Sequence, residues 1–154
     1  MPHEPLRPMI KPLEAGDRTA WADLWRAYLA FYETVLPDEV YASTWSRLLD
    51  PAEPTWGALA LRDGRPVGLV HWIYHRTNWS IADNCYLQDL FVAPDGRGQG
   101  HGRALIEHVA ADATARGCSR VYWTTHRTNH TAMQLYDRLA SESGFLQYRM
   151  TLTP

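Results

Sequence analysis

The sequence has almost no lysine and no surplus of positive charge. Lys11 is the only lysine among 154 residues, arginine supplies every other basic side chain, and the formal net charge is −2. Proteins that bind nucleic acid carry a basic patch or stripe, so this balance argues against nucleic acid as a partner. A P-loop needs a lysine directly after its last glycine, and the chain has no such Gly-Lys-Ser/Thr sequence.

Cysteines and long apolar runs are also scarce. Cys85 and Cys118 are the only cysteines, and no apolar stretch approaches the ~20 residues that span a bilayer. Residues 1–12 are rich in proline and show no signal-peptide pattern. We therefore expect a cytoplasmic protein with reduced thiols and no membrane association.

Histidines are plentiful, at seven, but their spacing does not favour a metal site. His71 and His75 share a face of an expected strand, and His126 and His130 flank an expected loop. None has a cysteine or carboxylate partner at the spacing of a zinc site. Structural or substrate-facing histidines are the preferred interpretation, and no metal is expected.

The length and a hydrophobic content of 45% suit one α/β domain over residues 1–154. Two helices come early, because apolar residues recur at spacings of three and four after Asp17 and again after Pro37. A hairpin turns at Asp63-Gly64, and Gly117 ends a third helix. The expected strands are 6–11, 56–61, 66–74, 83–92 and 120–126, and the expected helices are 17–35, 38–49, one centred on 105–113 and one from 129.

The most informative segment is a glycine-rich stretch between an expected strand and an expected helix. Alternating glycines let the backbone adopt unusual φ/ψ values and approach a ligand closely. The unpaired N–H groups and positive dipole end of the helix that follows attract phosphate. The segment therefore predicts a pyrophosphate seat, made of Arg97, Gly98, Gln99, Gly100, His101 and Gly102.

The dinucleotide fingerprint G-x-G-x-x-G does not fit this stretch. It would require glycine at position 103 or 101, where Arg103 and His101 stand. A nucleotide-binding module is kept as an alternative, which binding of ATP or NAD would favour.

A second motif lies downstream, from Asn129 to Tyr136, and leads to Gly144-Phe145. Offsets of three and seven put Asn129, Ala132 and Tyr136 on one helical face, as a long thin ligand would need. The alternative is an N-capped amphipathic helix whose tyrosine packs in the core.

Together the two motifs resemble those of the GCN5-related N-acetyltransferases, Gln/Arg-x-x-Gly-x-Gly/Ala followed by Asn-x-x-Ala-x-x-Leu-Tyr and Gly-Phe. The resemblance is specific over residues 85–148 and closest to polyamine and histone acetyltransferase homologues. One departure is that Asp137 to Ser143 separate Tyr136 from Gly144, which an extra helical turn would accommodate. The resemblance implies the GNAT fold, a mixed central sheet of about six to seven strands with about four helices.

The resemblance also implies acetyl-coenzyme A as cosubstrate and an acyltransferase activity. Its pyrophosphate would lie on the glycine stretch and its pantetheine along the strand at Leu90, Phe91 and Val92, as a ligand added to a sheet edge. Arg97, Arg103 or Arg127 are candidates for the phosphates, and Asn129 and Ala132 for contact with the cofactor. Homodimers are common in the family.

In this resemblance Tyr136 is the acid that protonates the coenzyme A sulfur, and a backbone N–H near Val92 polarises the thioester carbonyl. The general base is an open question, because polyamine acetyltransferases carry glutamate where Gln88 stands, and glutamine cannot accept the proton. Asp89 is the first candidate, although in a regular strand it faces away from Gln88 unless a bulge re-aims it. A water relay to Asp83, His71 or His75 is the alternative.

The acceptor is expected to be a small primary amine such as a polyamine or an amino acid. Tyr32, Gln88 and Asp89 are the candidate acceptor contacts, since aromatic and acidic groups suit a cation. The alternatives are a protein or peptide amine, or a sensor that binds acyl-coenzyme A without transferring the acyl group, which Gln88 favours.

Overall fold

The structure is a computed structural model that describes residues 8–153. The chain divides into two units, one that ends at Thr124 and one that begins at Thr125. The first unit holds the sheet and three of the helices, and the second holds the last helix and the C-terminal segment. The expectation of a single domain over residues 1–154 stays a prediction.

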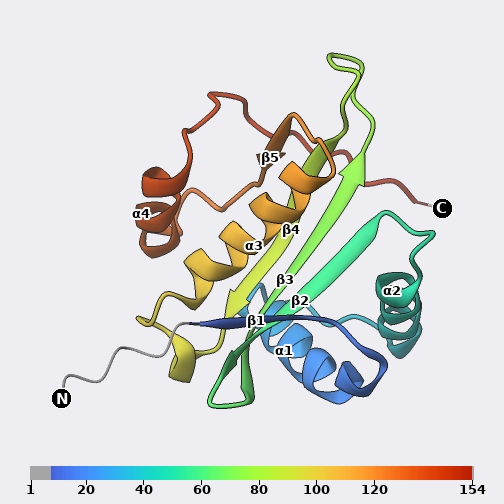
Figure 1. Cartoon of the computed structure of the whole chain (residues 1–154), viewed down its shortest axis with the longest axis vertical. Coiled ribbons are helices and arrows are strands. Elements are labelled where there is room, and N and C mark those ends of the chain that lie inside the picture. Colours follow the sequence, from blue (N-terminus) through green and yellow to red (C-terminus); the bar gives the residue numbers. More distant parts are fainter. Residues whose placement is uncertain (1–7, 154) are drawn as a thin grey trace. The chain divides into compact units, whose positions relative to one another are not determined.

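A five-stranded mixed sheet organises the first unit (Figure 1). Its order along the sheet follows the chain, and every neighbouring pair is antiparallel except the last, which is parallel. The helix before the last strand provides the connection that a parallel pair requires. The strands are β1 (Met9–Pro12), β2 (Thr55–Arg62), β3 (Arg65–His75), β4 (Asn84–Val92) and β5 (Arg120–Tyr122).

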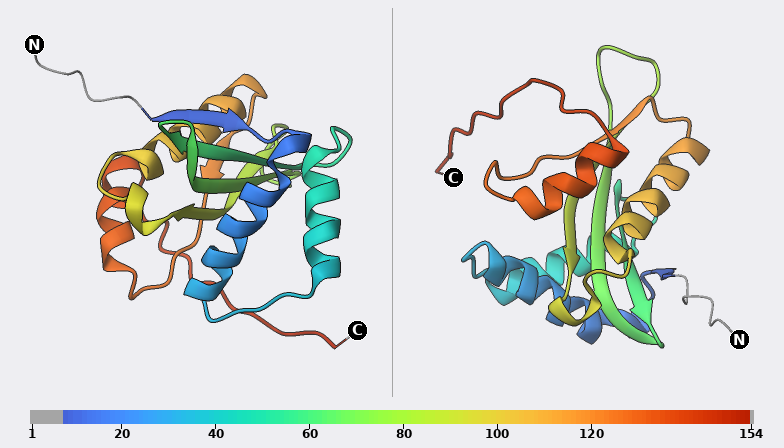
Figure 2. Two further views of the ribbon diagram at one scale, coloured as in Figure 1. Left: turned by 90° about the horizontal axis from the view of Figure 1, so that it is seen from below. Right: turned by 90° about the vertical axis from the view of Figure 1, so that its left-hand side faces the viewer.

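Helices cover both faces of this sheet (Figure 2). On one face, α1 (Arg18–Phe31) and α2 (Asp38–Leu49) pack a core of tryptophan and leucine side chains against Leu59 and Leu69. On the other face lies α3 (His101–Ala115), whose Leu105 comes so close to the sheet that a Cβ added at Gly68 would lie 3.2 Å from it. The GNAT fold class is therefore observed, with five strands among residues 8–153 in place of the expected six to seven.

The helix α1 ends at Phe31, four residues before the expected end at Val35. A Schellman motif ends it, because the amide of Glu33 donates to Ala30 O at 2.9 Å and that of Thr34 to Leu29 O at 2.9 Å. Glu33 takes the left-handed conformation, with φ 53°, where glycine is usual. A glutamate gives no helix-stop signal, which explains the error.

The ends of the chain differ from expectation as well. The expected edge strand 6–11 is observed as β1 (Met9–Pro12), and Leu6 and Arg7 lie outside the described residues. β5 ends at Tyr122 instead of at residue 126. In the second unit α4 (His130–Leu139) has no additional turn, and residues 140–153 contain no strand.

The two cysteines are free: Cys85 is buried in β4 and Cys118 is half-buried. Burial raises the pKa of the Cys85 thiol to about 12, so it stays protonated near neutral pH. Within residues 8–153, no helix combines the length and the apolar character that crossing a bilayer would require.

Candidate active site

The glycine stretch leaves β4 through a short 3-10 turn, Pro94–Gly96, and enters α3 at His101. Gly98 and Gly100 have φ values of 76° and 81°, in the left-handed region that disfavours a side chain. Gly96 is required for another reason, since a Cβ there would lie 2.9 Å from the Cβ of Val67. The unusual φ values expected of the glycine stretch are thus observed at Gly98 and Gly100, whereas Gly96 is required by packing.

The backbone nitrogens of this loop are available to a ligand. Within residues 8–153, no group accepts a hydrogen bond from the amides of residues 98–103. The first internal bond of the helix runs from Ala104 N to Gly100 O, at 3.0 Å. Free N–H groups at a helix N-terminus form an anion site, so the loop fits a diphosphate.

The edge of β4 beside the loop is also open. β5 pairs with β4 only from Asn84 to Tyr86, so the remaining residues of β4 have no strand partner on that side within the described chain. Leu90, Phe91 and Val92 lie on this stretch and pair on the other side with Val70, Leu69 and Gly68 of β3. An extended amide-bearing ligand such as pantetheine fits an edge of this kind.

Two of the three candidate arginines have protein partners. Arg97 Nε donates to Val92 O at 3.1 Å, which ties the loop to the end of β4. Arg103 Nε lies 2.8 Å from Glu107 Oε1 in an exposed pair along α3. Arg127 is an exposed residue of the second unit. Arg97 is thus the arginine that the structure fixes at the loop.

A β-bulge in β4 decides where the candidate base lies. His71 pairs with Asp89 and Trp72 pairs with Leu87, so Gln88 is the extra residue without a counterpart on β3. Beyond such a bulge the alternation of side chains is reset. Asp89 therefore faces α1 together with His71, whereas Leu87 shares the α3 face with Trp72; Gln88 is exposed.

Asp89 belongs to a buried chain of hydrogen bonds. The indole Nε1 of Trp21 donates to Nε2 of His71 at 2.9 Å. The other ring nitrogen of His71, Nδ1, lies 3.0 Å from Oδ2 of Asp89. The phenol of Tyr28 lies near this carboxylate, whose charge helps to raise the pKa of the phenol. Sequence reasoning considered His71 only as an alternative base and missed Trp21, because residues 50 positions apart give no local signal.

Aromatic rings lie next to this carboxylate. Tyr28 contacts Tyr32 and Phe91, with ring centroids 5.1 and 6.2 Å apart. Burial, and then the nearby carboxylate of Asp89, raise the pKa of the Tyr28 phenol well above its usual range. The same two causes, burial and the charge of Asp89, raise the pKa of the half-exposed Tyr32. The structure thus brings the predicted residues Tyr32 and Asp89 together.

Two of the three alternative relay residues, His75 and Asp83, lie at the other end of β3 and β4. His75 pairs with Asn84, and its Nε2 lies 2.6 Å from the hydroxyl of Tyr122. Asp83 forms an ion pair with Arg76 at 3.3 Å. Four residues of strand span about 13 Å, so neither is adjacent to Asp89. In the described part of the chain, no group of three histidine, cysteine or acidic residues comes together to hold a metal ion.

The second unit contains the other predicted site residues. Asn129 occupies the N-cap position of α4, with its backbone O accepting from Met133 N at 3.0 Å and with no capping bond from its side chain. Ala132 and Tyr136 are half-buried, as are Leu135 and Leu139. The helix has no fully buried residue, and the role of Tyr136 stays a prediction.

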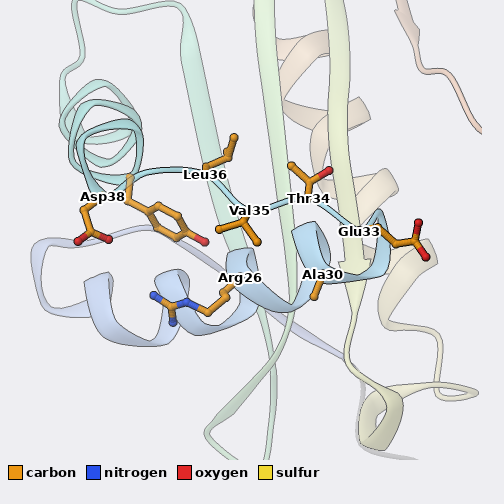
Figure 3. A pocket seen from close by; sticks show the side chains of 8 residues that line it. Arg26, Ala30, Glu33, Thr34, Val35, Leu36 and Asp38 are labelled. Carbon is orange, nitrogen blue, oxygen red and sulfur yellow. The ribbon is translucent and has the colours of Figure 1, made fainter.

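A separate cavity of about 540 Å³ lies between α1, the segment after it and α2 (Figure 3). Its lining carries charges of both signs and contains neither Asp89 nor Tyr32, two of the predicted acceptor contacts. A candidate site apart from this cavity is therefore formed by the amides of residues 98–103 (the anion seat), the edge of β4 at Leu90 to Val92, and Asp89. The lining residues are Arg26, Ala30, Glu33, Thr34, Val35, Leu36, Asp38 and Tyr41.

Known proteins share both the sequence and the fold. A D-amino-acid N-acetyltransferase of Saccharomyces cerevisiae, HPA3, is 38% identical over 145 residues, which cover 93% of this chain and 90% of the relative. A thialysine N-epsilon-acetyltransferase of Mus musculus is 36% identical over 87 residues, covering 53% of this chain and 49% of its own length. The aminoglycoside acetyltransferase AAC(6')-Iy, solved with the bisubstrate analogue CoA-S-monomethyl-acetylneamine, has a TM-score of 0.82 at 18% identity, covering 96% of this chain and 99% of that one.

The family match extends over both units of the structure. The sequence model of the Acetyltransferase (GNAT) family matches residues 21–140, from the tryptophan that bonds His71 to the end of α4. It includes the bulged strand, the loop with free amides and the helix of Tyr136. The chain therefore belongs to the GNAT acetyltransferase family and is an N-acetyltransferase.

Proposed function

We propose that this enzyme transfers the acetyl group of acetyl-coenzyme A to the primary amine of a small molecule, with an amino acid as the preferred acceptor. The observation that supports the proposal is the row of amides from Gly98 to Arg103, which have no acceptor among residues 8–153, beside the edge of β4 that has no strand partner among the same residues. That pair of features fits a diphosphate joined to an extended amide chain. The choice of an amino acid rests on the relative named for D-amino acids, which matches nearly the whole chain.

When bound, acetyl-coenzyme A supplies an activated thioester carbonyl. The loop amides and Arg97 would hold the diphosphate, and the edge of β4 at Leu90 to Val92 would align the pantetheine. A backbone N–H at Val92 would donate to the carbonyl oxygen. Holding the amine and the thioester together removes much of the entropic barrier to direct attack.

Two side chains would move protons. Asp89, on the α1 face of β4, accepts the proton of the incoming ammonium, and the aromatic rings of Tyr28 and Tyr32 favour a cation beside it. Tyr136 donates a proton to the departing sulfur. Asn129 and Ala132, on the same helix, are proposed cofactor contacts, and Gln88 is a proposed acceptor contact.

The test is thiol release from acetyl-coenzyme A over a panel of D- and L-amino acids, thialysine, polyamines and peptide amines. We expect turnover with free amino acids and a loss of about 100-fold in kcat for Tyr136→Phe. Tyr148→Phe is the matched control, since this tyrosine of the same unit is 91% exposed. Tight binding of coenzyme A without turnover on any amine would favour the sensor, and turnover on peptides alone would favour a protein acceptor.

A further inference from the structure

The hydrogen bonds around His71 determine which of its nitrogens carries a proton. An indole Nε1–H is only a donor, so His71 Nε2 must accept the bond from Trp21 with an unprotonated lone pair. The proton of the neutral ring is then on Nδ1, and it points to Asp89 Oδ2 at 3.0 Å. Adding a second proton to Nε2 would require the Trp21 bond to break inside the core, where Trp21 is fully buried.

Every element that packs on His71 supports this arrangement. Gly57 of β2 pairs with His71, and a Cβ there would lie 3.2 Å from the imidazole, so the ring lies against bare backbone. Trp25 of α1 contacts the ring edge-on at 4.9 Å. From α2, Tyr41 reaches the cluster only through Trp21, at 6.0 Å. Asp89 is the one charged group in contact with the ring among the described residues.

An imidazolium at position 71 would change the carboxylate. A cation 3.0 Å from Asp89 would stabilise its charged form and make it a weaker proton acceptor. A neutral His71 instead gives the carboxylate a hydrogen bond and a fixed orientation without neutralising it. Within the described residues no lysine or arginine forms an ion pair with Asp89.

We propose that Trp21 holds His71 as the neutral Nδ1–H tautomer and thereby keeps Asp89 oriented and free of a cationic partner. Trp21 and His71 are positioning residues, because they act through Asp89 and not on the substrate. The consequence for the rate rests on the proposed acetyl transfer, whereas the protonation state of His71 is a property of the folded chain alone.

The first measurement is the pair of ring nitrogen shifts of His71 in ¹⁵N-histidine-labelled protein, assigned by its loss in His71→Asn. We expect a pyrrole-type Nδ1 and a pyridine-type Nε2 that persist over the pH range in which an exposed histidine takes up its second proton. A pyrrole-type Nε2, or uptake of the second proton over that range in the unmodified protein, would overturn the proposal whether or not any amine is acetylated.

The second measurement compares Trp21→Phe with Trp25→Phe. Both remove a buried indole that touches His71, but Trp25 Nε1 has no hydrogen-bond partner within the described residues. In Trp21→Phe we expect Nε2 to take up a proton on mild acidification and kcat to fall about 10-fold at that pH, with recovery at higher pH and little change in KM for the amine. Trp25→Phe should retain the shifts and the pH profile of the unmodified protein.

Trp21→Phe protein that keeps both the shifts and the pH profile would contradict the role of Trp21. If this variant does not fold, the shifts of the unmodified protein decide the question alone. Absence of turnover in the unmodified protein would count against the proposed function and leave the nitrogen shifts as the test of this inference.

Discussion

Each face of the sheet has a carboxylate next to a tyrosine, and the two carboxylates differ in their partners. On the α1 face, the side chain of Asp89 is 11% exposed and its hydrogen-bond partner is His71, which we propose to be neutral. On the α3 face, Asp112 is 37% exposed, accepts from the hydroxyl of Tyr74 and pairs with Arg116 at 3.3 Å. The guanidinium of Arg116 also lies over the ring of Tyr74 at 4.4 Å.

From the difference in their partners we infer that Asp89 is a reactive group and Asp112 a structural one. A carboxylate that already has a cation gains little from meeting an ammonium, and exposure lowers the energy of such a pair further. Hydrogen bonds from neutral donors favour the charged form of a carboxylate without neutralising it, so it can still meet an incoming cation. We therefore propose a chemical role for Asp89 on one face of the sheet and a packing role for Asp112 on the other.

The difference between Asp89 and Asp112 is tested most directly by removing each carboxylate in turn. Asp89→Asn should lower kcat about 100-fold to 1000-fold, because the amide cannot take up the proton of the amine. Asp112→Asn should retain kcat and lower the free energy of unfolding by about 1 kcal/mol. Steady-state kinetics and urea unfolding measure the two effects, and an equal loss of kcat in both variants would abolish the distinction.

The anion seat contains neither Asp89 nor Asp112. A substitution in it should therefore weaken cofactor binding and leave the proton transfer unchanged. Gly100→Ala forces a side chain into the left-handed region, and we expect the affinity for coenzyme A to fall about 10-fold, which is the result of roughly 1–2 kcal/mol of strain. Isothermal titration calorimetry measures it.

The matched control for the anion seat is Gly64→Ala. Gly64 has the same left-handed backbone, with φ 76°, in the β2–β3 turn, and a Cβ there meets nothing within 4 Å. It should lower stability and retain the affinity for coenzyme A. Equal affinity losses in the two variants would indicate a general effect of strain and not a seat for the diphosphate.

Removing the hydroxyl of the tyrosine next to each carboxylate, Tyr28 or Tyr74, should have a smaller effect than removing the carboxylate. Tyr28→Phe removes the hydroxyl near Asp89 and should lower kcat about 3-fold to 10-fold, because the carboxylate and the incoming ammonium lose a polar neighbour. Tyr74→Phe removes bonds to Asp112 and to Trp72 Nε1, the latter at 3.1 Å, and should lower the unfolding free energy by about 1–2 kcal/mol with kcat retained. A stability loss without a rate loss in Tyr28→Phe would make its role structural.

The smallest expected effect concerns stability and pH at His101. Burial, and then the nearby charge of Arg62, lower the pKa of this side chain in the folded state below 6.5. The unfolded chain therefore binds a proton first as the pH falls, so stability is constant above about pH 6.5 and decreases below it. Urea midpoints at several pH values measure the slope, which should be shallower in His101→Gln. Parallel curves for the two proteins would assign the slope to other groups.

Local signals predicted much of the fold and part of the site. The bounds of α2 match the sequence prediction, because Pro37 and Asp50-Pro51 mark both of its ends. The glycine loop was predicted because alternating glycines allow unusual φ values, and Gly98 and Gly100 do take the left-handed conformation. The end of α1 was missed because Glu33 takes the left-handed conformation without the usual glycine.

Long-range pairing was not predictable from the sequence. The bonds from Trp21 to His71 and from His71 to Asp89 depend on how helix and strands meet, and no spacing in the chain encodes them. The bulge at Gln88 was considered as an option, but only the register with β3 places it. Residues 140–153 form no strand, although the resemblance to the family implied six to seven strands in all.

The extra residue at Gln88 determines on which face of the sheet each later residue of β4 lies. Residues before it keep their faces whatever happens at this position, whereas every residue after it depends on the count. If Gln88 were paired in a regular strand, it would lie opposite Leu87 on the α1 face, and Asp89 would lie on the α3 face with Leu87. Deleting Gln88 would remove the bulge and leave Leu87 and Asp89 on the faces that they have now. One residue without a partner thus keeps the acid of β4 on the α1 face of the sheet.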